Sequence, residues 1–132
     1  MEKEQLITGP IVVDSCMWIE LLRGSATGKK LQELLDKEQS LFISSLTLTE
    51  VYHYLLKKKE PSCQRFIDFI RNMSFVISVN EDIALKSALL RIEKGWGAGD
   101  AIIFATALSQ HAKVLTCDSD FSGEEVVFFI AK

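Results

Sequence analysis

The chain alternates short runs of apolar residues with longer segments in which apolar residues recur at helical spacing. The short runs are rich in Val, Ile, Leu and Phe and contain few polar positions, as expected for parallel strands covered on both faces. They predict strands at residues 10–14, 40–44, 75–79, 113–116 and 126–129. The longer segments predict helices at residues 15–22, 27–37, 47–58, 63–72, 82–94 and 100–111. This alternation predicts an α/β fold with a parallel sheet between helices.

The last two predicted helices differ in character. The segment 82–94 is amphipathic, and its apolar set comprises Ile83, Leu85, Ala88, Leu89 and Ile92. A glycine-rich break follows at residues 95–99. The segment 100–111 is almost wholly apolar and contains several alanines, which predicts a buried helix packed closely on the sheet.

Four acidic residues lie where a predicted strand ends or a predicted helix begins: Asp14, Glu50, Asp100 and Asp118. In an alternating β/α chain, such positions meet at the edge of the sheet formed by the carboxyl ends of the strands. Carboxylates crowded there would repel one another strongly. A hard divalent cation with oxygen ligands removes this repulsion. The pattern therefore indicates a Mg²⁺ or Mn²⁺ site, of the kind that commonly serves phosphate chemistry.

Each acid also has a purely structural explanation. Asp14 is placed to cap the helix that follows it, and Glu50 ends a Thr-Leu-Thr-Glu sequence that fits a capping box. Asp100 at a helix start is stabilised by the helix dipole by up to about 1 kcal/mol, and Asp118 and Asp120 lie in a turn, where Asp is common. We favour one shared site, because four separate coincidences at one sheet edge are less plausible. Of the two, Asp118 is favoured over Asp120 as the inner residue of the metal site, because it is nearer the end of the predicted strand.

Composition narrows the class of protein without identifying it. The chain has 132 residues, 48% of them hydrophobic, and we expect one globular domain over residues 1–132. A formal net charge of −3 argues against a broad basic face for nucleic acid, but a bound metal would make a locally positive site. Three cysteines without paired spacing argue against a disulfide framework or a zinc cluster, and Cys16 and Cys117 are interpreted as small buried residues. The charged start of the chain resembles neither a signal peptide nor a membrane span, so a cytoplasmic location is expected.

Four short motifs together resemble those of PIN-domain proteins, in particular the compact ribonuclease toxins of the VapC kind. The motifs are VVDS at residues 12–15, LTEV at 48–51, GDAII at 99–103 and LTCDSDF at 115–121. They occur in the family's order and cover nearly the whole chain. The resemblance implies a three-layer α/β/α fold with a five-stranded parallel sheet. It also implies a homodimer and, for toxin members, an inhibiting antitoxin protein, although the family contains members that are not toxins.

The resemblance further implies a metal-dependent nuclease site at Asp14, Glu50, Asp100 and Asp118. The expected reaction is hydrolysis of an RNA phosphodiester, in which Mg²⁺ or Mn²⁺ orients the phosphate, activates water and stabilises the transition state. We assign metal binding to Asp14, Asp100 and Asp118, directly or through water. Glu50 would hold a water or act as general base, and Asp120 would bind through water.

Neighbours of these acids are assigned supporting roles. Thr116 matches a hydroxyl that often supports the cluster in the family, and Ser15 matches the small or polar residue after the first Asp. Arg23, Lys29 and Lys30 lie on the connection after the first helix, from which they are expected to reach RNA phosphates near the sheet edge. No membrane partner is expected.

Two other functions remain open from the sequence. A non-catalytic interaction module on the same fold would use the acids only as helix caps. A phosphoacceptor receiver domain also gathers acids at a sheet edge, but it needs an acceptor Asp after the third strand, and residues 76–80 (VISVN) contain none. Trp18 is expected in the core, or at a surface that binds a second copy or the antitoxin.

Overall fold

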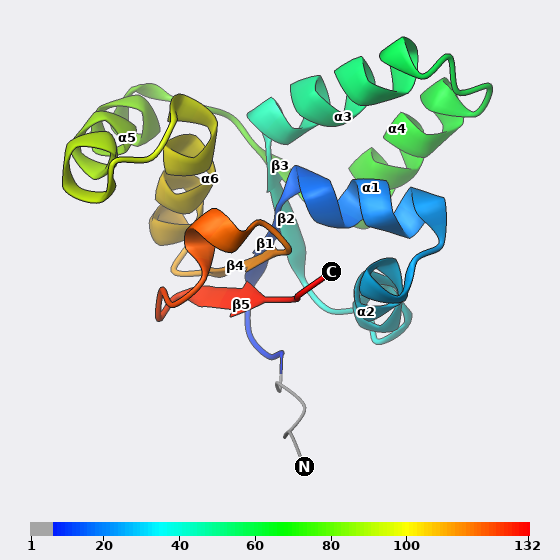
Figure 1. Ribbon diagram of the computed structural model, residues 1–132, viewed down its shortest axis with the longest axis horizontal. Coiled ribbons are helices and arrows are strands. Elements are labelled where there is room, and N and C mark those ends of the chain that lie inside the picture. Colours follow the sequence, from blue (N-terminus) through cyan, green and yellow to red (C-terminus); the bar gives the residue numbers. More distant parts are fainter. Residues whose placement is uncertain (1–6) are drawn as a thin grey trace.

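The computed structural model describes residues 7–132, and its centre is a five-stranded sheet (Figure 1). The strands are β1 (Ile11–Val13), β2 (Leu41–Ser44), β3 (Phe75–Ile77), β4 (Lys113–Thr116) and β5 (Val127–Phe129). They are all parallel and lie in the order β3-β2-β1-β4-β5. β1 is therefore central, and its register places Val13 beside Leu115 of β4. The parallel sheet predicted from the apolar runs is confirmed.

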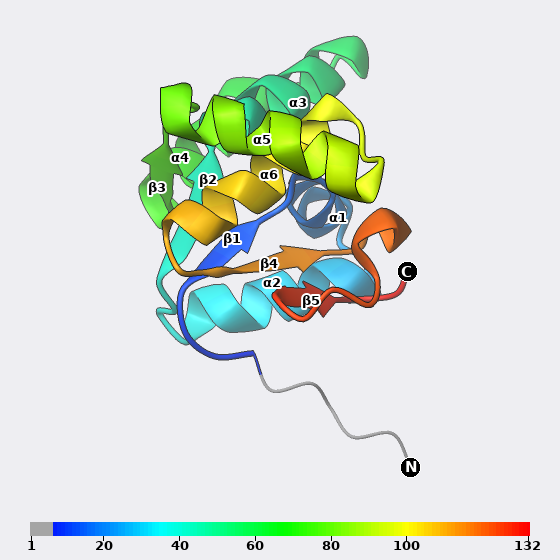
Figure 2. The ribbon, with the colours of Figure 1, turned by 90° about the vertical axis from the view of Figure 1, so that its left-hand side faces the viewer.

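Helices cover both faces of the sheet, which gives the three-layer α/β/α architecture implied by the family resemblance. They are α1 (Ser15–Arg23), α2 (Ala26–Asp36), α3 (Ser45–Lys57), α4 (Cys63–Met73), α5 (Glu81–Lys94) and α6 (Ala98–Ser109). A short 3₁₀ turn, η1 (Ser119–Phe121), follows β4. In Figure 1 α1–α4 lie on one side of the sheet and α5 and α6 on the other, and Figure 2 shows α5 and α6 facing the viewer.

Alternate side chains of the central strand contribute to two separate cores. Ile11 and Val13 belong to the cluster shared with α1–α4, whereas Val12 belongs to the cluster shared with α5 and α6. All three side chains are fully buried. Parallel strands buried on both faces are mostly apolar, which is consistent with the absence of polar residues from β1. Trp18 of α1 is also fully buried in the first cluster, so it is a core residue and not a surface for a partner.

α5 differs from the sequence-based interpretation in the face that it buries. Its buried apolar residues are Ile83 and Leu90, which belong to the cluster shared with α6. Leu85, Leu89 and Ile92, which were assigned to the apolar set, are 69%, 68% and 89% exposed. Helical spacing places the two groups on opposite faces, so the helix has two apolar faces and packing selects one of them. We call the exposed group of Leu85, Leu89 and Ile92 the α5 stripe.

The other predicted elements begin and end within two residues of the observed bounds. The sheet order excludes the receiver-domain alternative, because receiver sheets have the order 2-1-3-4-5. Within residues 7–132, no helix is long and apolar enough to cross a lipid bilayer. The charged N-terminal residues considered above lie outside the described part of the chain.

Candidate active site

Asp14 is a buried acid at the centre of the site. It follows β1 directly, is 6% exposed and caps α1, where the backbone N–H of Ser15 donates to its Oδ1 at 2.8 Å. The hydroxyl of Thr116, the last residue of β4, donates to its Oδ2 at 2.8 Å. Because β1 and β4 are neighbours in the sheet, Asp14 is both a helix cap and a contact of the β4 carboxyl end.

Thr116 also connects Asp14 to the acids that follow β4. Its Oγ1 accepts the backbone N–H of Asp118 at 2.9 Å. Asp118 caps the η1 turn, where its Oδ1 accepts the N–H of Asp120 at 2.9 Å. One carboxylate oxygen from each of Asp100, Asp118 and Asp120 lies within 4.8 Å of the others. Asp100 comes from the first turn of α6, so two separate segments supply this group of three carboxylates.

Glu50 reaches the same edge from α3, but not as a capping residue. The capping-box interpretation is wrong because α3 begins earlier than predicted, at Ser45, with Ser44 as its N-cap. Glu50 therefore lies in the second turn of the helix. Its Oε1 accepts the hydroxyl of Ser15 at 3.2 Å, and its Oε2 would lie 3.8 Å from a Cβ added to Gly99. The Glu50 carboxylate is thus placed between the first residues of α1 and those of α6.

Burial and the charges of neighbouring acids raise the pKa values of Asp14, Glu50 and Asp100. Burial is the main cause of the raised pKa of Asp14, and the charge of Asp118 acts in the same direction. Burial also raises the pKa of Glu50, followed by the charge of Asp14. The pKa of Asp100 is raised to about 7, first by burial and then by the charges of Asp118, Asp14 and Asp120. A divalent cation would offset this concentration of negative charge.

Two cysteines take part in this network, although the sequence suggested only small buried residues. Cys117 is buried, whereas Cys16 is half-buried. The Sγ of Cys16 accepts the backbone N–H of Cys117 at 3.2 Å and lies 3.5 Å from Oγ1 of Thr116. It also donates to Oδ2 of Asp14 at 3.7 Å. The only signal in the sequence was that each cysteine is close to one of the acids.

The three basic residues expected to contact RNA lie away from the acids. α1 begins at the site with Ser15 and ends at Arg23, which at 1.5 Å per residue is about 12 Å further along the helix axis. There the Nε of Arg23 lies 3.7 Å from Oε2 of Glu20. Lys29 and Lys30 follow in the first half of α2, which packs against the backbone of α1 at Glu20. The structure therefore does not bring these residues to the carboxylates.

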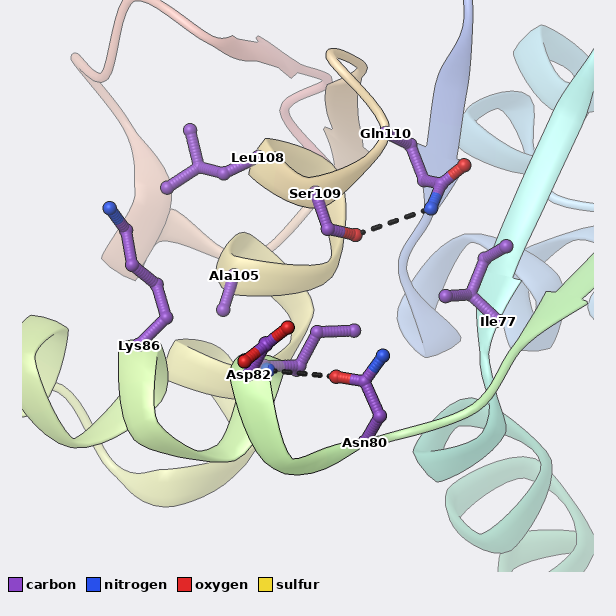
Figure 3. Close-up of a pocket in the computed structure, with 9 residues that line it drawn as sticks. Ile77, Asn80, Asp82, Lys86, Ala105, Leu108, Ser109 and Gln110 are labelled. Carbon is purple, nitrogen blue, oxygen red and sulfur yellow. Dashed lines mark hydrogen bonds between the residues drawn. The ribbon is translucent and has the colours of Figure 1, made fainter.

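A hollow between α5 and α6 is separate from the acids (Figure 3). Its lining includes Asn80 and Asp82 at the start of α5 and Ser109 and Gln110 at the end of α6. Asp100 lies at the opposite end of α6. The hollow is therefore not part of the candidate active site.

Comparisons with known proteins bear on the family and the fold. The family model described as PIN domain matches residues 11–123. A chain of a toxin-antitoxin complex from Klebsiella pneumoniae is 26% identical, with a TM-score of 0.74 over 91% of this chain and 99% of that chain. FitAcB from Neisseria gonorrhoeae is 23% identical, with a TM-score of 0.74 over 91% of this chain and 96% of that chain.

VapC20 from Mycobacterium tuberculosis, described as a Sarcin-Ricin loop cleaving toxin, is a third similar structure. It is 19% identical, with a TM-score of 0.71 over 92% of this chain and 98% of that chain. At this identity, as for FitAcB, the likeness concerns the fold alone. No curated protein sequence matches the chain.

Proposed function

Because the chain belongs to the PIN-domain family, we propose that it is a divalent-metal-dependent ribonuclease that hydrolyses RNA phosphodiester bonds. The main support is the convergence of five acids, Asp14, Glu50, Asp100, Asp118 and Asp120, at the carboxyl edge of the sheet. Three of their carboxylates lie within 4.8 Å of one another. Like charges at this spacing are costly in a partly buried site unless a cation binds among them.

The side chains fit Mg²⁺ or Mn²⁺, because the five acids offer oxygen ligands and both ions prefer oxygen. In the proposal, Asp14, Asp100 and Asp118 hold the ion, and Glu50 and Asp120 contribute through water. When bound, the ion would polarise the scissile phosphate and lower the pKa of the attacking water.

Residues around the acids prepare them for this role. The hydroxyl of Thr116 and the N–H of Ser15 each hold one oxygen of Asp14, so the Asp14 carboxylate is fixed before any ligand arrives. The Ser15 hydroxyl orients Glu50. In the metal-free protein the pKa of Glu50 is raised, first by burial, which favours a role as proton acceptor. We therefore propose that Glu50 accepts the proton of the attacking water.

The proposal extends to the partners of the protein: it is the toxin of a toxin–antitoxin pair and acts in the cytoplasm as a homodimer. The 26% identity to a chain of the Klebsiella pneumoniae toxin-antitoxin complex supports the toxin role. The homodimer is what the PIN-domain resemblance implies, and the α5 stripe is an exposed apolar face available for its interface.

The test is cleavage of a mixed RNA pool by protein that has been purified through a denaturing step and refolded, which removes any bound antitoxin. Reactions contain Mn²⁺, Mg²⁺ or EDTA, and the wild type is compared with Asp100→Asn. Asp82→Asn is the matched control, because it makes the same change in the exposed first turn of α5. We expect cleavage with either metal, none with EDTA, and a loss of at least about 100-fold in Asp100→Asn.

Two outcomes would contradict the proposal in different ways. A folded protein that cuts RNA with neither metal would favour the non-catalytic interaction module. Cleavage by Asp100→Asn at the rate of Asp82→Asn would show that the activity does not depend on this group of acids.

A further inference from the structure

Two segments of different secondary structure supply the three closest acids. Asp100 lies in the first turn of α6, whereas Asp118 caps η1 and Asp120 lies within it. Their carboxylates come within 4.8 Å of one another, so when they are ionised and no cation is bound they repel one another across the two segments. The backbone hydrogen bonds of the η1 turn run within the turn itself. Side-chain contacts are therefore needed to hold η1 against the start of α6.

Trp96 makes such contacts from the connection between α5 and α6. Its ring packs on Phe104 of α6, with 5.0 Å between ring centroids, and on Phe121 of η1 at 5.1 Å. Phe104 and Phe121 also stack on each other at 6.3 Å. Both phenylalanines are buried, so these contacts exclude water. We call Trp96, Phe104 and Phe121 the aromatic clasp.

The aromatic clasp is adjacent to the acids on both segments. Phe104 is four residues after Asp100, so the two side chains lie on the same face of α6, one turn apart. Phe121 directly follows Asp120. A change in how the three rings pack would therefore shift Asp100, which lies one helical turn from Phe104. It would also shift Asp120, which directly precedes Phe121.

An ion pair joins the same parts of the chain. The Nζ of Lys94, at the end of α5, lies 3.1 Å from Oε1 of Glu124, three residues after η1. This ammonium is also 6.0 Å from the centroid of the Trp96 ring. The Nε of Arg91 donates to the Trp96 carbonyl at 3.4 Å. Trp96 is therefore held through its ring and through its backbone.

We propose that Trp96 is a positioning residue: through the aromatic clasp it sets the spacing between Asp100 and the pair Asp118 and Asp120, and so sets the affinity of the site for its divalent ion. The inference rests on the proposed metal-dependent function. Trp96 acts through the acids, since its ring offers no oxygen ligand. Groups that orient metal ligands typically change metal affinity by about 10- to 100-fold when they are removed.

The test measures Mn²⁺ binding by calorimetry without RNA, for the wild type, Trp96→Ala and Trp96→Phe. Phe66→Ala is the matched control, because Phe66 is a half-buried ring on α4 that stacks on Phe69 at 6.1 Å, on the other side of the sheet. We expect Trp96→Ala to bind Mn²⁺ at least about 10-fold more weakly and Trp96→Phe within about threefold of wild type. Phe66→Ala should lower the melting temperature and leave Mn²⁺ binding unchanged.

RNA cleavage supplies a second readout that a purely structural role would not change in the same way. Trp96→Ala should need about 10-fold more Mn²⁺ for half its maximal rate, in line with its weaker binding. At saturating Mn²⁺ its rate of RNA cleavage should approach that of the wild type, because the substitution removes none of the five acids.

The outcomes separate the two proposals. A folded Trp96→Ala protein that binds Mn²⁺ as the wild type does overturns the positioning role and leaves the proposed function standing. A wild type that binds no Mn²⁺ overturns both. If Trp96→Ala does not fold, Trp96→Leu takes its place, because leucine keeps apolar volume without a ring. Unchanged Mn²⁺ binding in Trp96→Leu overturns the positioning role equally.

Discussion

Substituting Asp100 by asparagine removes one charge from the carboxylate group and nearly keeps the shape of the side chain. The pKa of Asp100 in the folded protein is about 7, raised from an ordinary value of 3.8 first by burial and then by neighbouring acids. Between these two pH values the folded chain keeps a proton that the unfolded chain has lost. Stability of the metal-free protein therefore falls as the pH rises through this interval, and the loss is complete above about pH 7.

The size of the effect follows from the pKa shift. At about 1.4 kcal/mol per pH unit, the full shift would correspond to about 4 kcal/mol. The Asp100 side chain is only partly buried, so water screens its charge and a smaller effect is expected. We expect Asp100→Asn to stabilise the metal-free protein by about 1–2 kcal/mol at a pH of about 8.5, relative to its effect at about pH 5.

The assay is urea unfolding in EDTA at both pH values. Asp68→Asn is the control, because it makes the same change at an exposed acid on α4, away from the group of carboxylates. Mn²⁺ should reverse the order at high pH, since it stabilises the wild type by binding the folded state and stabilises Asp100→Asn less. An unfolding free energy that differs between wild type and Asp100→Asn by the same amount at both pH values would refute the reasoning.

Three further changes test the packing, the site and the proposed dimer. Gly28→Ala should destabilise the protein by about 1–3 kcal/mol in thermal unfolding, because the added Cβ would collide with the backbone of α1. Gly97→Ala is the control and should destabilise the protein less, because its Cβ would meet nothing within 4 Å. Equal losses of stability would contradict the close packing of Gly28 on α1. Thr116→Val should cost about 1–3 kcal/mol and lower RNA cleavage, because two hydrogen bonds of the site are lost. Thr106→Val is the control, because it removes a hydroxyl that donates to a carbonyl of its own helix, and it should leave RNA cleavage unchanged. A similar loss of cleavage in both variants would argue against a specific role of Thr116 in the site. Leu89→Glu should convert a dimer to a monomer in sedimentation while changing the unfolding of the protomer by less than about 0.5 kcal/mol; a persistent dimer would place the interface away from the α5 stripe.

The sheet and most of the acids of the candidate site could be predicted from the sequence for a simple physical reason. Parallel strands covered on both faces are mostly apolar, so polar residues that follow an apolar run mark the end of a strand, and Asp14 is the first such residue after β1. The β4 strand ends on the polar Thr116, two residues before Asp118. Because parallel strands end at the same edge of a sheet, predicting where each strand ends was enough to predict that Asp14 and Asp118 lie close together. The order of the strands in the sheet depends on packing and was not predicted.

Two interpretations failed where the local sequence supports more than one structure. Near Glu50, residues 44–47 (Ser-Ser-Leu-Thr) offer three side chains able to cap a helix, and the structure uses Ser44 instead of Thr47. In α5 both faces are apolar, so periodicity alone does not decide which face packs on α6. The aromatic clasp was also missed, because contacts between Trp96, Phe104 and Phe121 arise only when η1 folds back against α6.

The order in which the site residues are synthesised has a consequence for a cell that makes this protein. β4, which lies between β1 and β5 in the sheet, is synthesised after β1, β2 and β3, and the Thr116–Asp14 hydrogen bond joins residues 102 positions apart. A nascent or prematurely terminated chain without β4 and η1 lacks Asp118 and Asp120 as well as the neighbour that fixes Asp14. The proposed nuclease site is therefore incomplete until β4 and η1 have been synthesised and have folded onto β1.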